Sequence, residues 1–141
     1  MIIKESIIIN APLSKVWEMF TDITRWMHWN TVMKDVSFEE ECLTNGTDLK
    51  CEFRPFTFPI KINIEIEDII PYERIVWSTR KKGLFVFHEF FFQQKEKGVL
   101  VTSKETFSGL YAAASGLLLP VKRMRLLTKT FLKDLKKASE S

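Results

Sequence analysis

The chain has 141 residues, a mass of 16.6 kDa and a formal net charge of +3 at pH 7. This length predicts one domain, spanning 1–141, that can bury a core without disulfides or metals. Twelve Phe and 4 Trp residues supply much aromatic surface. The small net charge and the absence of a recognised basic motif argue against nucleic-acid binding. No apolar run reaches the roughly 18–20 residues that a transmembrane segment needs.

The two cysteines, Cys42 and Cys51, flank a predicted turn at Asn45-Gly46. If that turn is of type I′, Cys42 faces Leu49, and Cys51 lies diagonally across at a distance too long for an unstrained disulfide. A longer turn would instead place the two cysteines opposite each other. The N-terminal segment has acidic and polar residues inside its apolar runs, unlike a secretory signal. We therefore expect reduced thiols and a cytoplasmic protein.

The first third of the chain predicts a strand followed by two short helices. Residues 2–9, IIKESIII, are typical of a strand, and 10–29 show apolar residues at helical spacing. Pro12 suits the first helical position, where its missing N–H group costs no hydrogen bond. A break near Thr21-Asp22 divides this helical region into two short pieces.

A series of strands is expected next. Residues 34–42 and 47–53 flank the Asn-Gly turn, and residues 53–59 contain two prolines, which indicate a loop or a strand edge. In 60–68, IKINIEIED, isoleucine alternates with polar residues, which is typical of a half-buried antiparallel strand with one wet face. Consecutive strands joined by short turns predict an antiparallel sheet.

The second half predicts three more strands and one long helix. The strands are 73–79 and the hairpin formed by 84–94 and 99–107. From about residue 110 the apolar period becomes helical, with a kink expected at Pro120. The helical apolar positions are Val121, Met124, Thr128, Phe131, Leu132 and Leu135. Helices must cover the single apolar face of the sheet, so the fold class is α+β.

The last hairpin carries ionisable residues among six phenylalanines. If Lys97-Gly98 form its turn, the facing pairs are Phe92 with Ser103, Phe90 with Glu105, and His88 with Phe107. These six residues share one face because the side-chain period of a strand is two. The opposite face carries polar residues that prefer water, so the face with His88 and Glu105 is expected to point inward. Phe87 and Phe91 then lie on the outer face, where they would suggest a homodimer surface.

An inward Glu105 needs a partner, because burying an unpaired carboxylate costs several kcal/mol. His88, its diagonal neighbour, is the obvious partner, directly or through water. Three interpretations stay open: a structural polar pair, a polar anchor in an apolar ligand cavity, or a general acid and base. The sequence has no HExxH, paired CxxC or phosphate-binding glycine loop, so we expect no metal and no cofactor.

Several short motifs occur in a fixed order along the chain. The N-terminal ones are Ala11-Pro12, Val16-Trp17, Asp22, Trp26 and Trp29. The later ones are Pro71, Trp77, Gly83, His88, Phe90, Glu105, Phe107 and Gly109. In order and spacing this set resembles the START-like, Bet v 1-like superfamily, in the SRPBCC branch labelled polyketide cyclase/dehydrase. Asn30 departs from the resemblance, because many relatives have proline after the second tryptophan.

The resemblance implies a helix-grip fold, in which a curved antiparallel sheet of six to seven strands surrounds a long C-terminal helix. It also implies a cavity between sheet and helix that binds a hydrophobic small molecule such as a lipid or polyketide-like compound. The expected ligand contacts are Trp77, His88, Phe90, Phe92, Ser103, Glu105, Phe107, Leu117, Met124 and Phe131. Residues 109–120 would form a mobile portal, with Gly109, Gly116 and Pro120 permitting movement.

Two other functions remain open beside ligand binding. A cyclase- or hydrolase-like enzyme would use His88 and Glu105 on one bound carbonyl compound. A protein-interaction module, as in co-chaperone relatives, would act through the Phe87 and Phe91 face or through the basic face of the last helix.

Overall fold

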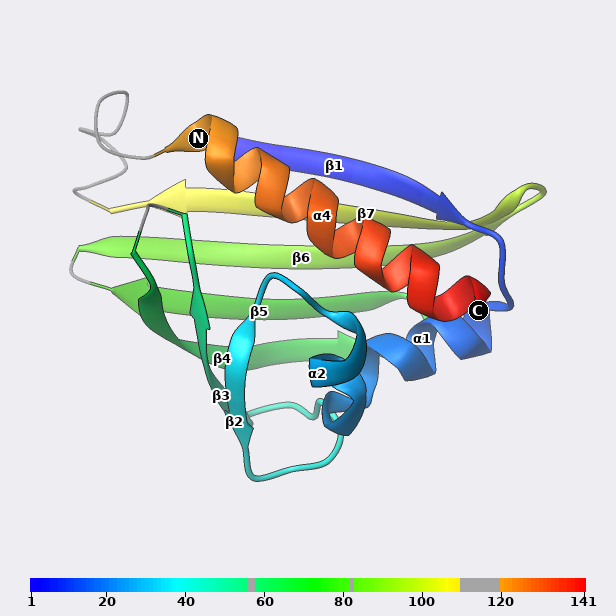
Figure 1. The fold of residues 1–141 in the computed structure, drawn as a ribbon, viewed down its shortest axis with the longest axis horizontal. Helices are drawn as coiled ribbons and strands as arrows, with labels where there is room; N and C mark the ends of the chain where they lie inside the picture. The colour runs from blue at the N-terminus through cyan, green and yellow to red at the C-terminus, as the bar shows by residue number, and fades with distance from the viewer. Residues whose placement is uncertain (56–57, 82, 110–119) are drawn as a thin grey trace.

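The computed structural model describes residues 1–55, 58–81, 83–109 and 120–141. In this part of the chain one antiparallel sheet of seven strands has the order β1-β7-β6-β5-β4-β3-β2. The elements are β1 (Ile2–Ile9), α1 (Leu13–Thr21), η1 (Ile23–Arg25), α2 (Trp26–Trp29), β2 (Lys34–Phe38), β3 (Asp48–Phe53), β4 (Ile60–Ile70), β5 (Arg74–Lys81), β6 (Leu84–Lys95), β7 (Gly98–Ser108) and α4 (Val121–Glu140). The sheet curves around α4, and α1 packs near the C-terminal end of that helix (Figure 1). The predicted α+β helix-grip fold is confirmed.

Local sequence explains the helices between β1 and β2. Pro12 is the N-cap of α1 rather than its first helical residue, with an extended backbone at φ −60 and ψ 143. The predicted break after α1 is confirmed: Asp22 leaves the helical conformation, and its carboxylate accepts a hydrogen bond of 3.1 Å from the Thr24 N–H. That bond caps η1, so the chain turns before α2 begins. His28 lies exposed at the end of α2.

The connection between β2 and β3 is longer than the predicted hairpin. Phe38, not Cys42, lies opposite Leu49, and Cys42 instead forms an isolated bridge with Asp22. The tight turn at Asn45-Gly46 exists, but Gly46 alone has a positive φ, +79, whereas type I′ requires it at both central residues. The intervening residues leave the ladder, and backbone hydrogen bonds join Glu41 to Ile23 and Leu43 to Thr21. Cys42 is exposed, Cys51 is buried, and both thiols are free.

The register of the β6–β7 hairpin differs from the prediction by two residues. Lys95 pairs with Gly98, so the turn residues are Glu96 and Lys97, neither of which has a positive φ. Gly98 is needed for another reason: with φ at +139, a Cβ there would lie 2.4 Å from the backbone oxygen of Ile9. The glycine therefore serves the close approach of β1. A two-residue shift preserves the face, so the predicted inner residues still point inward.

The outer face of β6 is less exposed than expected. Phe87 and Phe91 are both only partly accessible. The Arg74 guanidinium lies 5.8 Å from the Phe91 ring centre and forms an ion pair of 2.6 Å with Glu89. The Arg74 guanidinium thus covers part of the Phe91 ring. Self-association through this face stays a prediction.

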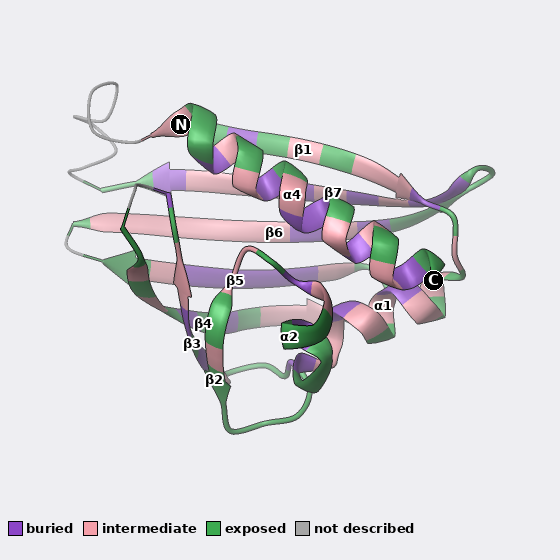
Figure 2. Cartoon of the chain, in the orientation of Figure 1, coloured by how far each residue is buried: buried purple, intermediate pink, exposed green. Residues whose placement is uncertain are grey.

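The core lies between the sheet and the helices, and Phe20 of α1 is at its centre. The Phe20 ring is fully buried and packs against five other rings, namely Trp26, Trp77, Phe90, Phe92 and Phe131, at centroid distances of 4.8 to 6.1 Å. Figure 2 shows that buried residues follow the side of α4 that faces the sheet. They recur at the predicted helical spacing.

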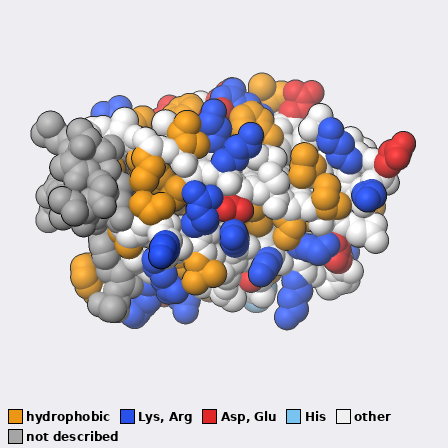
Figure 3. Space-filling model, turned by 90° about the horizontal axis from the view of Figure 1, so that it is seen from above, with side chains coloured by type: hydrophobic (Ala, Val, Ile, Leu, Met, Phe, Trp, Pro, Cys, Tyr) orange, Lys and Arg blue, Asp and Glu red, His pale blue; other side chains and the backbone are white. Residues whose placement is uncertain are grey.

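The helical residues expected before Pro120, 110–119, lie outside the described residues. Pro120 is the N-cap of α4, with φ −79 and ψ 73, and α4 begins at Val121. The kink expected at Pro120 stays a prediction. Lysine and arginine side chains are distributed over the outer surface around α4 and β1, with apolar side chains between them (Figure 3). Among the described residues, no helix is both long enough and apolar enough to cross a membrane.

Candidate functional site

A cavity of about 510 Å³ lies between the sheet and α4. Side chains from β3, β4, β5, β6 and β7 form its walls, and one side of α4 lies over it. Val32 and Met33, just before β2, complete the wall. Lys81, Leu84 and Pro120 line the end at which α4 begins. The space is therefore the one that a helix-grip sheet leaves around its central helix.

Most residues predicted to contact a ligand lie around this cavity. Eight of them line it: Trp77, His88, Phe90, Ser103, Glu105, Phe107, Met124 and Phe131. Phe92 does not. Its ring packs edge-on against Trp17 at 5.0 Å, in the solid core under α1, because it lies further along β6 than the cavity extends. Leu117 and nearly all of the predicted portal, residues 110–119, lie outside the described residues.

The wall opposite the polar groups was not among the predicted ligand contacts. Ile60, Ile62 and Ile64 of β4, with Phe53 of β3, form an apolar surface there. The alternation of isoleucine in 60–68 was the signal for it, since it marks one side of this strand as inward. Thr128 was also missed, although it lies four residues after Met124 and therefore on the same side of the helix.

His88 lies on the inner face of β6, enclosed by aromatic rings. Its imidazole stacks on Phe90 at 4.1 Å and meets Trp77 edge-on at 5.3 Å. The Nε2 atom is 2.7 Å from the Ser103 hydroxyl. Burial disfavours the charged form and lowers the pKa of His88 to about 3. The imidazole is therefore neutral at physiological pH.

Glu105 lies directly opposite His88 in the β6–β7 ladder. The Thr128 hydroxyl donates a hydrogen bond of 2.6 Å to its Oε1 atom and thereby links β7 to α4. Burial raises the pKa of Glu105 to about 7, and the bond from Thr128 opposes part of that rise. Near neutral pH the carboxyl group is thus close to the midpoint of its titration, where it can accept or release a proton.

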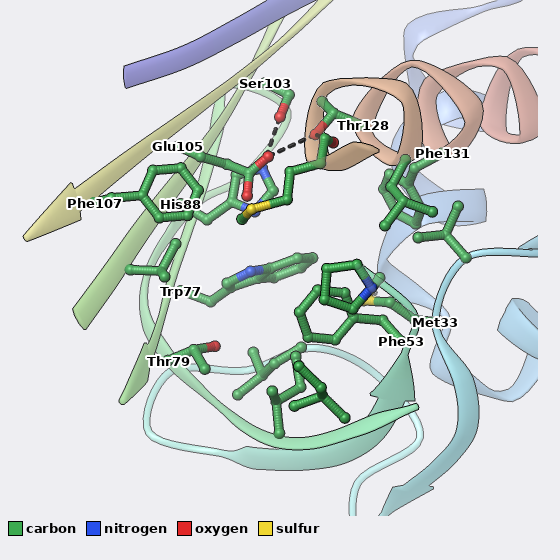
Figure 4. Close-up of a pocket in the computed structure, with 18 of the residues that line it drawn as sticks. Met33, Phe53, Trp77, Thr79, His88, Ser103, Glu105, Phe107, Thr128 and Phe131 are labelled. Atoms are coloured by element: carbon green, nitrogen blue, oxygen red, sulfur yellow. Dashed lines mark hydrogen bonds between the residues drawn. The ribbon is translucent and has the colours of Figure 1, made fainter. Parts of the chain in front are cut away.

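The predicted direct hydrogen bond between His88 and Glu105 is not formed. Each side chain has its own partner: Ser103 for the imidazole and Thr128 for the carboxyl group. Figure 4 shows these four polar side chains together on one side of the cavity, with Trp77 beside them. Among the described residues, nothing forms a hydrogen bond with His88 Nδ1 or Glu105 Oε2. These two atoms remain available to a bound molecule.

The fold, the cavity and its polar groups together define the class of protein. A helix-grip sheet encloses an apolar cavity, and a short row of polar groups marks one wall. The sequence matches the family described as polyketide cyclase/dehydrase and lipid transport over residues 2–140. The chain therefore belongs to this family.

Solved structures with the same fold come from several sources. A hypothetical protein of Helicobacter pylori has a TM-score of 0.80 at 19% identity, covering 99% of this chain and 88% of the other. A Thermus thermophilus protein has a TM-score of 0.80 at 13% identity, with coverages of 99% and 97%. The di-domain ARO/CYC protein BexL of the BE-7585A biosynthetic pathway has a TM-score of 0.76 at 16% identity. The match with BexL covers 100% of this chain and 50% of BexL. At these identities the similarity shows the fold alone, and no curated protein matches significantly.

Proposed function

We propose that this protein binds a hydrophobic small molecule in the cavity under α4. The unfilled volume of about 510 Å³ carries the proposal. The aromatic residues could have filled the interior, yet they surround a space in the size range of small-molecule sites, about 300–1,000 Å³. Maintaining such a space forgoes packing energy that a filled core would have. A guest recovers that energy when it binds.

A substitution that fills the cavity tests this proposal. Leu127 lines the cavity, whereas its neighbour Leu126 is 51% exposed on the outer side of α4. We expect Leu127→Trp to abolish the thermal stabilisation that wild type shows with apolar ligands, because the indole occupies their space. Leu126→Trp adds the same group at the surface and is expected to leave the stabilisation unchanged.

The measurement is a thermal-shift screen with fatty alcohols, sterols, alkyl amines and aromatic polyketides. A guest at 100 times its dissociation constant stabilises the folded state by about 2.7 kcal/mol, which is readily observed as a rise in Tm. If none of these compounds stabilises wild type, the binding function is wrong. If both tryptophan variants keep the stabilisation, the guest binds elsewhere.

A catalytic function is a second candidate, because His88 and Glu105 face each other across one strand pair. Glu105, with its pKa raised to about 7, has the proton affinity of an efficient general acid or base. A cyclase- or hydrolase-like reaction would place a substrate carbonyl between these two groups.

Glutamine at position 105 separates this candidate from simple binding. For an enzyme, we expect Glu105→Gln to lower the turnover of a carbonyl substrate by about 10²–10⁴-fold while substrate binding persists. For a binding protein, the variant changes affinity and there is no turnover to lose. Single-turnover product analysis with wild type and variant gives the result.

We also propose that the protein acts in the cytoplasm. The free thiols of Cys42 and Cys51 support this location, since exported proteins commonly oxidise their cysteines. Labelling of the exposed Cys42 by a thiol reagent in intact cells, with and without permeabilisation, tests the location.

A further inference from the structure

We infer that the guest is a hydrophobic amine whose ammonium group pairs with Glu105. This inference rests on the proposed function and adds the chemical class of the ligand. The charges inside the cavity are unbalanced. Among the described residues that line the space, Glu105 is the single acidic side chain, and within the same part of the chain no cation lies close enough to form an ion pair with it.

The groups around Glu105 leave that imbalance uncorrected. From β1, Ile3 lies opposite it, and from α4 it meets Thr128, whose hydroxyl carries no charge. From β6 it faces His88, which is neutral at physiological pH because its pKa is lowered to about 3. Arg125 of α4 pairs instead with Glu5 at 2.8 Å. In the part of the chain that the structure describes, β1, β6 and α4 therefore each present a neutral side chain to this carboxyl group.

Lys81 is the cation among the described residues that line the cavity, and its ammonium group has another partner. Lys81 is exposed at the end where α4 begins, and its Nζ donates to the backbone oxygen of Lys61 on the neighbouring strand. Its position lies four residues beyond Trp77 along β5, whereas Trp77 lies opposite His88 at the level of the polar row. A guest that is to neutralise Glu105 must therefore bring its own positive charge.

Aromatic rings near Glu105 favour a cation as well. Phe107 is two residues further along the same face of β7, and Trp77 lies beside the polar row (Figure 4). Ring faces attract an ammonium group, and the attraction increases when the group is desolvated. The neutral imidazole of His88 adds an acceptor or a donor without repelling positive charge. Carboxylate and rings together form the kind of surroundings that recognise ammonium groups.

The raised pKa of Glu105 also favours a cationic guest. Without a guest, the ionised carboxylate is disfavoured by burial, so the pKa rises to about 7. An ammonium group within a few ångströms favours the ionised form of the carboxyl group. A cationic guest therefore binds more tightly once Glu105 has lost its proton. A carboxylate guest has the opposite effect, because two like charges would share one apolar space. A fatty acid with its head group at this depth is therefore disfavoured.

Three guests with the same ten-carbon chain test the inference: decylamine, 1-decanol and decanoate. At pH 8 we expect decylamine to bind wild type at least about tenfold more tightly than 1-decanol, and decanoate to bind most weakly. Between pH 5.5 and 8 the affinity for decylamine should rise, since Glu105 ionises while an alkyl amine keeps its proton, as lysine does, up to a pKa of about 10. Isothermal titration calorimetry measures each affinity.

The variant Glu105→Gln keeps the shape of the side chain and removes its charge. It should lose at least about tenfold in affinity for decylamine and lose the pH dependence, while 1-decanol binds within about threefold of wild type. Leu126→Trp is the surface control and should match wild type with all three guests. The pH series on wild type needs no variant, so it decides the question even if Glu105→Gln folds poorly.

Two outcomes would overturn the inference. If 1-decanol binds as tightly as decylamine at pH 8, or if decylamine binding does not rise with pH, Glu105 does not select an ammonium group. In either case binding by the alcohol still supports the proposed function. If none of the three guests binds and the apolar screen is also negative, the proposed function itself fails.

Discussion

Replacing Phe20 by alanine is expected to lower the free energy of unfolding by about 3–5 kcal/mol, the usual cost of deleting a buried phenylalanine ring. This ring is fully buried, and it connects α1 with β5, β6 and α4 through contacts with Trp77, Phe90 and Phe131. Its removal leaves a void next to an existing cavity, and rigid neighbouring rings limit collapse into it. Such a loss is a large share of the stability of a typical domain, about 5–15 kcal/mol.

Phe38→Ala is the matched control, because this ring is 39% exposed at the edge of the sheet. We expect it to cost less than about 1 kcal/mol, in the range of surface substitutions. Urea unfolding of both variants, followed by tryptophan fluorescence, gives the two free energies. A loss for Phe20→Ala no larger than that for Phe38→Ala would show that α1 does not hold the core together.

Variants at positions 88 and 105 are expected to change the pH dependence of stability in opposite directions. The folded-state pKa of Glu105 is raised from 4.5 to about 7, so the wild-type protein loses stability as pH rises through this interval. The folded-state pKa of His88 is lowered from 6.5 to about 3, so wild type gains stability as pH rises from 3 to 6.5. Between pH 4.5 and 6.5 the two contributions cancel.

Removing one group of this pair exposes the contribution of the other. Relative to wild type, the stability of Glu105→Gln should rise between pH 4.5 and 6.5 with a slope of up to about 1.4 kcal/mol per pH unit. His88→Gln should show a slope of similar size and opposite sign. Urea unfolding of the ligand-free proteins at half-unit intervals of pH measures both slopes. Two curves parallel to that of wild type would mean that neither charge is penalised by burial.

The fold was predictable because strong local patterns agree with one another. The alternating isoleucines of β4, the helical spacing in α4 and the break at Asp22 each appear in the structure where the sequence places them. Turn geometry was harder to predict, as Gly98 illustrates. A glycine is required at this position because the backbone of Ile9, in a strand distant along the chain, approaches it closely. The local sequence alone assigns this glycine to the turn. Long-range contacts of this kind have no local signature.

The candidate site was predictable on its polar side and less so on its apolar side. His88 and Glu105 lie on the inner face as predicted, because a register shift of two residues leaves every side chain on the same face of the sheet. The hydrogen bonds to Ser103 and Thr128 depend on the actual register and on how closely α4 packs against the sheet. No local sequence pattern encodes either of these. The end of the cavity depends on how far α1 fills the interior, and this is why Phe92 belongs to the core.

The pairing of β1 with β7 has a consequence for how the chain acquires its structure during synthesis. Ile2 lies opposite Thr106, so β1, which is synthesised before the other strands of this sheet, has no neighbouring strand until β7 is made. Contacts this distant along a chain slow folding. The helix that closes the cavity emerges later still. A nascent chain therefore presents an open apolar trough to the cell, and early termination before residue 121 would leave a product prone to aggregate.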